Sequence, residues 1–154
     1  MFKKILLIII LLFTQSCGYE AMYAKKSKAD YTFSISKILF KGEREINVGI
    51  EEKLKNYTSI KKKRDFKIEV KSFSEKIVLT KDAKGDPTSF KITVFVEVNI
   101  FSNDKIQSKL KLEKNLKYNN NTNKFDLNEF EKQTKKDLGK LISDKLIYKI
   151  SKIK

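Results

Sequence analysis

The residues from 90 to 101 alternate between large apolar side chains and a second, mostly polar set over the whole run. The apolar set is Phe90, Ile92, Val94, Val96, Val98 and Ile100. Successive side chains of a strand point to opposite faces of a sheet, so a period of two predicts a strand. A β-branched run of this length favours the centre of a sheet. The chain must therefore build a sheet around this segment.

Three further segments are predicted as strands. The first alternates at Tyr31, Phe33 and Ile35, runs toward Phe40 and ends at Gly42. The second points Phe66, Ile68 and Val70 inward and continues less regularly over 76–80, and the third covers 106–118. Turn residues are dense at 82–87 and 102–105. Short hairpin turns make the last three strands antiparallel.

Two segments with helical period lie between and after the strands. Over 43–57, one helical face carries Ile46, Ile50, Leu54 and Tyr57, and Gly49 indicates close packing. The closing helix is predicted from Asp126, as N-cap with Glu129 completing a capping box, to about residue 152. Its predicted core-facing side is Phe130, Thr134, Leu138, Leu141, Ile142, Lys145 and Ile150.

The element order predicts one α+β domain of the order β-α-β-β-β-α. We expect a mostly antiparallel four-stranded sheet with both helices packed on one face. The predicted domain covers residues 29–154 and is preceded by a polar segment over 17–28 that reads as a tether.

The first 16 residues have the layout of a bacterial export signal. Lys3 and Lys4 precede an apolar run from Ile5 to Phe13, and small or polar residues follow up to Ser16. The run is about half of the ~20 residues that span a bilayer, which favours a signal peptide over residues 1–16 rather than a transmembrane helix.

Cys17, the only cysteine, stands where a lipoprotein signal places its acylated residue. The prediction is a lipid-anchored chain that begins at Cys17, although Thr14 and Gln15 depart from the usual lipoprotein pattern. The alternative is an ordinary cleaved signal with an incidental cysteine. Gly18 follows where aspartate would retain a lipoprotein in the inner membrane, so the predicted location is the periplasmic side of the outer membrane.

The predicted processed chain is strongly basic. It keeps 32 of the 34 cationic side chains and all 19 acidic ones, a net charge of +13. This balance favours a polyanionic partner such as anionic lipid or a phosphorylated glycolipid, and export argues against nucleic acid. The alternative is that the lysines fill solvated faces in a chain whose Lys, Asn and Ile content reflects an AT-rich genome.

The composition is unfavourable for several classes of catalysis. The chain has no histidine, and its one thiol is assigned to the anchor, which excludes Ser-His and Cys-His nucleophiles and histidine metal sites. Ser-Lys or carboxylate chemistry stays open, but no spacing points to it. We expect a binding or structural protein, not an enzyme, with no metal and no cofactor.

The segment Cys17-Gly18-Tyr19, followed by Met22-Tyr23, resembles the start of alphaproteobacterial lipopolysaccharide-assembly lipoproteins, the LptE family. The order of elements, the turn at 82–87, the long strand and the closing helix extend the resemblance over essentially the whole processed chain. It implies an outer-membrane lipoprotein that plugs an LptD-type β-barrel, assists its assembly and binds lipopolysaccharide on its way to the surface.

Lipid A phosphates are polyanions that lysines can meet as mobile point charges. The candidates for this contact are Lys81 and Lys84 at the hairpin tip and Lys109 and Lys111 on one face of the last strand. Two alternatives stay open: a peripheral basic lipoprotein that binds anionic lipid or cell-wall polymer without a barrel, and an accessory or inhibitor of a periplasmic enzyme.

Overall fold

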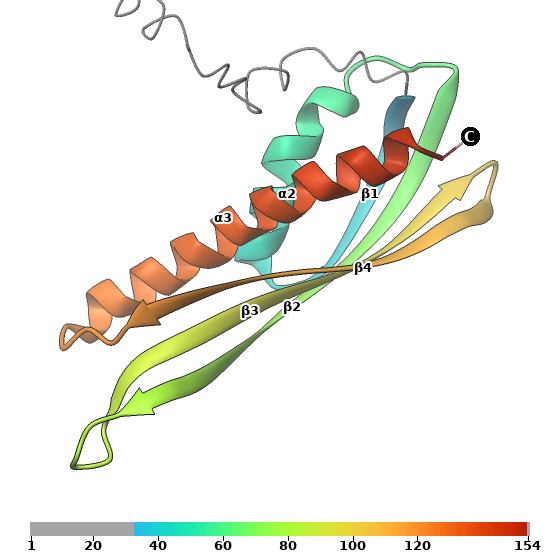
Figure 1. Ribbon diagram of the computed structural model, residues 1–154. Helices are drawn as coiled ribbons and strands as arrows, with labels where there is room; N and C mark the ends of the chain where they lie inside the picture. Colours follow the sequence, from blue (N-terminus) through green and yellow to red (C-terminus); the bar gives the residue numbers. More distant parts are fainter. Residues whose placement is uncertain (1–32, 154) are drawn as a thin grey trace, which may run out of the picture. The chain divides into compact units, whose positions relative to one another are not determined.

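The computed structural model describes residues 33–153, so the predicted signal, Cys17, the tether and Tyr31 lie outside the described residues. The elements are β1 (Phe33–Gly42), α2 (Arg44–Leu54), the 3-10 turn η2 (Lys55–Tyr57), β2 (Arg64–Lys81), β3 (Pro87–Ser102), β4 (Lys105–Asn119) and α3 (Lys124–Ser151). This order confirms the predicted α+β class (Figure 1).

The four strands form one sheet in the order β1-β2-β3-β4. β1 is parallel to β2, whereas β2, β3 and β4 are antiparallel neighbours. The connection from β1 to β2 contains α2, which returns the chain to the starting end and so permits parallel pairing. The later connections are short turns, and the sheet is mostly antiparallel as predicted.

β3 is the central element that its alternation predicts. It pairs with β2 on one side and β4 on the other. Its apolar set is buried throughout, at 8% exposure or less, and consists of Phe90, Ile92, Val94, Val96, Val98 and Ile100. These side chains form the middle of the core beneath the helices.

β2 is one continuous strand of 18 residues, where the sequence pattern is regular only in its first part. Its second part extends with β3 past the helices as a hairpin arm (Figure 1). Ile77, Val78 and Leu79 are 45%, 43% and 39% exposed there, and the register shifts between Val78 and Thr80. A strand needs alternating apolar and polar residues only where one of its faces is buried, so this alternation is lost along the exposed arm.

Gly42 ends β1 for a steric reason. Its φ is +101°, and a Cβ atom there would lie 1.8 Å from the backbone oxygen of Ser72. Only glycine combines this conformation with so close an approach to the neighbouring strand. The predicted strand end at Gly42 is confirmed.

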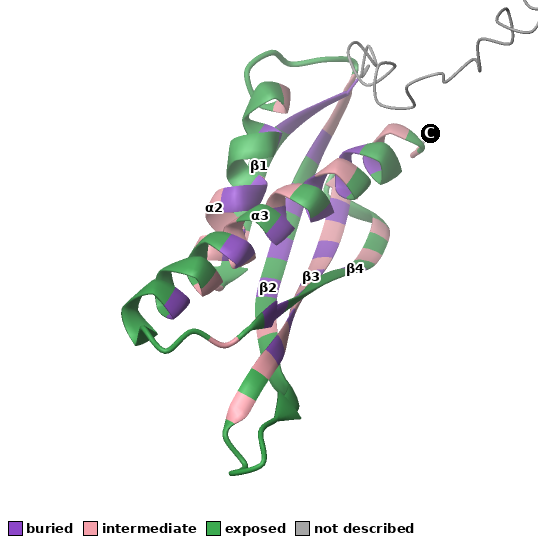
Figure 2. Ribbon diagram, turned by 60° about the vertical axis from the view of Figure 1, so that its left-hand side comes forward, coloured by how far each residue is buried: buried purple, intermediate pink, exposed green. Residues whose placement is uncertain are grey.

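Both helices lie on one face of the sheet, and each carries buried residues along its length (Figure 2). A Cβ atom at Gly49 would lie 2.0 Å from the backbone oxygen of Lys136, and one at Gly139 would lie 2.6 Å from that of Ile46. The two helices therefore touch through backbone at two glycines, which confirms the close packing predicted at Gly49.

The start of α3 differs from the prediction. The N-cap is Asn123, whose side chain accepts hydrogen bonds from the N–H groups of Phe125 and Asp126. Asp126 is therefore inside the first turn, where the helix dipole favours a carboxylate, and the predicted capping box is wrong. Asn and Asp both cap well, so the sequence did not separate the two positions.

The buried face of α3 is also rotated from the predicted one. Leu141 is 52% exposed, Phe130 is 45% exposed and Lys145 is exposed. The buried residues are Leu127, Thr134, Leu138, Gly139, Ile142, Ser143, Leu146, Ile147 and Ile150. Contact through Gly139 turns the small-residue side of the helix toward α2, which moves Leu141 outward.

A polar network joins α2, α3 and β2 at their meeting point. The Glu43 carboxylate accepts hydrogen bonds from Ser74 Oγ at 2.8 Å and from Lys135 Nζ at 2.7 Å. Partial burial raises the pKa of Glu43, but the hydrogen bonds from Lys135 and Ser74 and the charge of Lys135 outweigh it and hold the pKa below its ordinary value. The ionised form of Glu43 is thus the form that the fold stabilises.

Candidate functional site

Lys81 and Lys84 lie at the tip of the hairpin arm. The side chain of Asp82 shapes this turn, because its Oδ1 atom accepts hydrogen bonds from the backbone N–H groups of Lys84 at 2.8 Å and of Asp86 at 2.9 Å. All residues from 81 to 86 are exposed. Two lysines and two aspartates alternate here, so the tip presents mobile cationic side chains on a turn whose formal charges cancel.

Lys109 and Lys111 lie on β4 and point to the sheet face opposite the helices. Lys109 pairs in register with Asn99, and Lys111 pairs with Glu97. Lys111 Nζ is 3.2 Å from Glu97 Oε1, and the Lys111 side chain is 87% exposed. An ion pair this exposed is screened by water, so it leaves the lysine available to other anions.

The structure does not bring the two pairs of lysines together. Lys81 pairs with Pro87, and Lys111 pairs with Glu97, ten residues further along β3. At about 3.3 Å per strand residue, this separation is roughly 33 Å. The hairpin tip and the β4 face are therefore two separate candidate surfaces.

An aromatic patch lies on the open sheet face near Lys111. Phe73 and Phe95 are cross-strand partners whose rings stack with centroids 5.0 Å apart. Phe73 is 38% exposed, and the two rings line a depression of about 360 Å³ together with Glu97, Lys111 and Glu113. Stacked, half-exposed phenylalanines on an open sheet face mark a surface suited to another protein.

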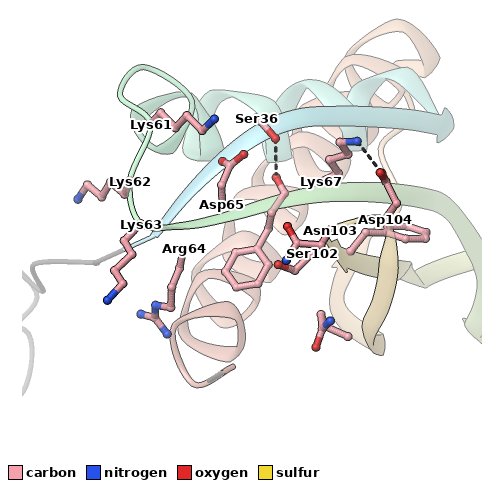
Figure 3. Close-up of a pocket in the computed structure, with 13 residues that line it drawn as sticks. Ser36, Lys61, Lys62, Lys63, Arg64, Asp65, Lys67, Ser102, Asn103 and Asp104 are labelled. Atoms are coloured by element: carbon pink, nitrogen blue, oxygen red, sulfur yellow. Dashed lines mark hydrogen bonds and ion pairs between the residues drawn. The ribbon is translucent and has the colours of Figure 1, made fainter.

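A second charged region lies at the opposite end of the sheet from the hairpin tip. We call it the basic end and define it by Lys61, Lys62, Lys63, Arg64 and Lys67, which line one depression of about 480 Å³. The first three extend from the loop before β2, and Lys67 lies beside Asp104 of the β3–β4 turn (Figure 3). Three segments distant in sequence thus meet at one concave surface.

Local contacts hold the basic end in shape. The Arg64 guanidinium donates to the backbone oxygens of Ser151 at 3.4 Å and Ile153 at 2.6 Å, which ties the end of α3 to β2. Lys67 Nζ lies 2.7 Å from Asp104 Oδ1, and this hydrogen bond and the lysine charge lower the pKa of Asp104. The β3–β4 turn has positive φ at Asn103 and Asp104, the geometry of a tight hairpin turn.

The sequence pattern singled out four lysines and not the basic end. The run from Lys61 to Arg64 is visible in the sequence as four consecutive cations. Its neighbours from the β3–β4 turn and the end of α3 become apparent only in the fold. Cys17, the predicted lipidation site, lies outside the described residues.

Solved structures of three lipoproteins share this fold. Rare lipoprotein B from Shewanella oneidensis is 13% identical, with a TM-score of 0.58 over 75% of this chain and 93% of that one. Lipoprotein B from Nitrosomonas europaea is 15% identical, with a TM-score of 0.55 over 82% of this chain and 89% of its own. A minor lipoprotein from Acinetobacter baumannii is 13% identical, with a TM-score of 0.55 over 79% of this chain and 94% of its own.

No family model and no curated protein sequence matches the chain. At these identities the likeness establishes the fold and is consistent with the fold that the LptE resemblance implies. None of the helices within residues 33–153 has the length and apolar character needed to cross a membrane.

Proposed function

We propose that this chain is an outer-membrane lipoprotein that plugs an LptD-type β-barrel, assists its assembly and binds lipopolysaccharide in transit. The observation that carries the proposal is the combination of Cys17 at the end of an export signal with a fold that recurs in solved lipoproteins. The basic processed chain and the sequence resemblance to the LptE family point the same way.

The proposal is one of binding, not catalysis. Histidine is absent from the whole sequence, and the single cysteine is assigned to the anchor on the periplasmic side of the outer membrane. Within residues 33–153, the surfaces that we consider for binding are the aromatic patch, the hairpin arm and the exposed lysines.

The open sheet face is our candidate for the barrel contact. Phe73 and Phe95 stack on this face. Leu39 of β1 points to the same face and is 42% exposed. Such a contact would bury half-exposed aromatic surface, whose stabilisation does not weaken as salt rises. It would therefore persist at salt concentrations that screen the lysines.

The hairpin arm is our candidate for the lipopolysaccharide contact. It places the exposed aliphatic residues Ile77, Val78 and Leu79 beside the exposed ammonium groups of Lys81 and Lys84 at the tip. An amphipathic glycolipid offers the matching chemistry, since its phosphates meet ammonium groups while its acyl chains meet apolar surface.

The first test is recovery of tagged, lipidated protein from detergent-solubilised outer membranes in high salt. We expect a large β-barrel at about one-to-one stoichiometry, with less barrel recovered for Phe73→Ser. The matched control is Phe125→Ser, because Phe125 is 72% exposed but lies at the start of α3. Recovery of the lipoprotein alone, with the tag accessible, would overturn the barrel proposal and favour a peripheral basic lipoprotein.

The second test separates the two lysine surfaces. Because they are roughly 33 Å apart, one glycolipid headgroup engages only one of them. We expect Lys81→Gln with Lys84→Gln to weaken cross-linking to lipopolysaccharide more than Lys109→Gln with Lys111→Gln does. The reverse ranking would move the contact to the β4 face, and no effect of either pair would refute both sites.

A further inference from the structure

The basic end has a charge excess that its own acids do not offset. Five cations and two acids, Asp65 and Asp104, line the depression. The cations therefore exceed the acids by three charges. Asp65 Oδ1 accepts a hydrogen bond from Ser34 Oγ at 2.7 Å, and Asp104 pairs with Lys67. The three exposed lysines of the loop, Lys61, Lys62 and Lys63, supply the outward charge of this end.

An exposed apolar residue and further cations lie beside the basic end. Ile60, directly before the lysine run, is 72% exposed. Lys149 and Lys152 are exposed near the end of α3, which Arg64 ties to β2 at this same end. An exposed aliphatic side chain among lysines is the pattern of a surface that lies against lipid headgroups.

The chain enters the domain at this end. β1 begins at Phe33, which is the register partner of Arg64. Phe33 follows Cys17 by 16 residues, a length that spans at most about 55 Å. The hairpin tip is 17 residues away along β2, roughly 56 Å further on. An anchor at Cys17 therefore limits how far the basic end can lie from the membrane surface.

We infer that the basic end binds the anionic phospholipid headgroups of the leaflet that holds Cys17, so that this end of the domain lies at the level of those headgroups. This inference rests on the lipid anchor of the proposed function, and neither the barrel nor lipopolysaccharide enters it. Each lysine close to an anionic surface strengthens attachment about fivefold, so three lysines provide roughly a hundredfold.

The test is amine footprinting of the full processed chain, purified from membranes and placed in phospholipid nanodiscs. Acetylation rates are compared in discs of phosphatidylglycerol and of phosphatidylcholine. We expect Lys61, Lys62 and Lys63 to react at least about tenfold more slowly in the anionic discs. Lys81 and Lys84 in the same molecules should react equally in both, and about 0.5 M salt should abolish the difference.

A pair of matched variants identifies the residues responsible. In the original protein the neighbouring Lys105, the first residue of β4, should also react more slowly in the anionic discs. Replacing Lys61, Lys62 and Lys63 by Gln should remove this protection of Lys105. The control replaces Lys114, Lys117 and Lys124 by Gln, three exposed lysines with the same total charge that lie away from this end. The control should keep the protection of Lys61, Lys62 and Lys63, and circular dichroism checks that both variants are folded.

Three outcomes would overturn the inference. Equal reactivity in the two kinds of disc would do so, as would equal loss of protection in both variants, because attachment would then follow net charge alone. An unacylated Cys17, detected by the mass of the N-terminal peptide, would remove the anchor and the proposed lipoprotein function together. Acylated protein with an unprotected basic end would refute this inference alone.

Discussion

Replacing Gly49 by alanine should destabilise the domain, although alanine is the better helix former. The new Cβ atom would lie 2.0 Å from the backbone oxygen of Lys136 and 2.9 Å from its carbonyl carbon. Real Cβ contacts essentially never fall below 3.0 Å, so α2 and α3 would have to separate locally by at least 1.0 Å. A backbone carbonyl inside a helix cannot swing aside as a side chain can.

The free energy of unfolding follows from two opposing effects. Helix propensity favours alanine by about 1 kcal/mol. Overpacking costs roughly 1–3 kcal/mol, and a gap of about 1 Å between the helices loses up to half of the dispersion energy at the contact. Because the atom in the way belongs to the backbone, we expect an overpacking cost at or above the upper end of that range. The free energy of unfolding should then fall by about 2 kcal/mol.

Urea unfolding of the processed chain, monitored by circular dichroism, measures this loss. The urea concentration at the midpoint should fall, and the dependence of the free energy of unfolding on urea concentration should stay the same. Gly139→Ala should lose less, because its Cβ atom would lie 2.6 Å from the oxygen of Ile46 and needs only about 0.4 Å of relief. Glu51→Ala, at an exposed position of α2, is the control for helix propensity. A midpoint for Gly49→Ala equal to or above that of the original protein would refute the reasoning.

Three further predictions concern the N-cap of α3, the stability of the fold at low pH and the β4 surface. Asn123→Ala should lower the free energy of unfolding by about 1 kcal/mol in urea titrations, and Asp126→Ala by only a few tenths; equal losses would contradict the assigned cap. Because the pKa of Glu43 is lowered in the fold, its contribution is present above the ordinary value of 4.5 and is lost as the pH falls below it. Glu43→Gln should therefore flatten the pH dependence of thermal stability below pH 4.5. An unchanged pH dependence in that range would argue against a stabilising role of ionised Glu43. Lys111→Ala should lower the free energy of unfolding in urea titrations by about 0.5 kcal/mol or less, because its ion pair with Glu97 is exposed to solvent; a larger loss would make this lysine unsuitable for the binding test.

Periodic and turn-forming residues made much of the fold predictable. The alternation of β3 predicted a central strand, and Ile46, Ile50 and Leu54 predicted the buried face of α2, all of which are buried. These patterns work because burial on one side imposes a period of 2 or 3.6 on the sequence. Where burial stops, as at Ile77 on the hairpin arm, the pattern fades and the length of β2 could not be predicted.

The sequence by itself determined the element order and the end of β1 at Gly42, because both depend on residues close together in the chain. The anchor at Cys17 stays a prediction of the same local kind. Only the tertiary structure decided which cations act together. It separated Lys81 from Lys111 by roughly 33 Å of strand and gathered Lys61 and Lys67 with the β3–β4 turn. Solvated lysines carry no periodic signal, since water accommodates them on any face, and their grouping follows from packing elsewhere in the molecule.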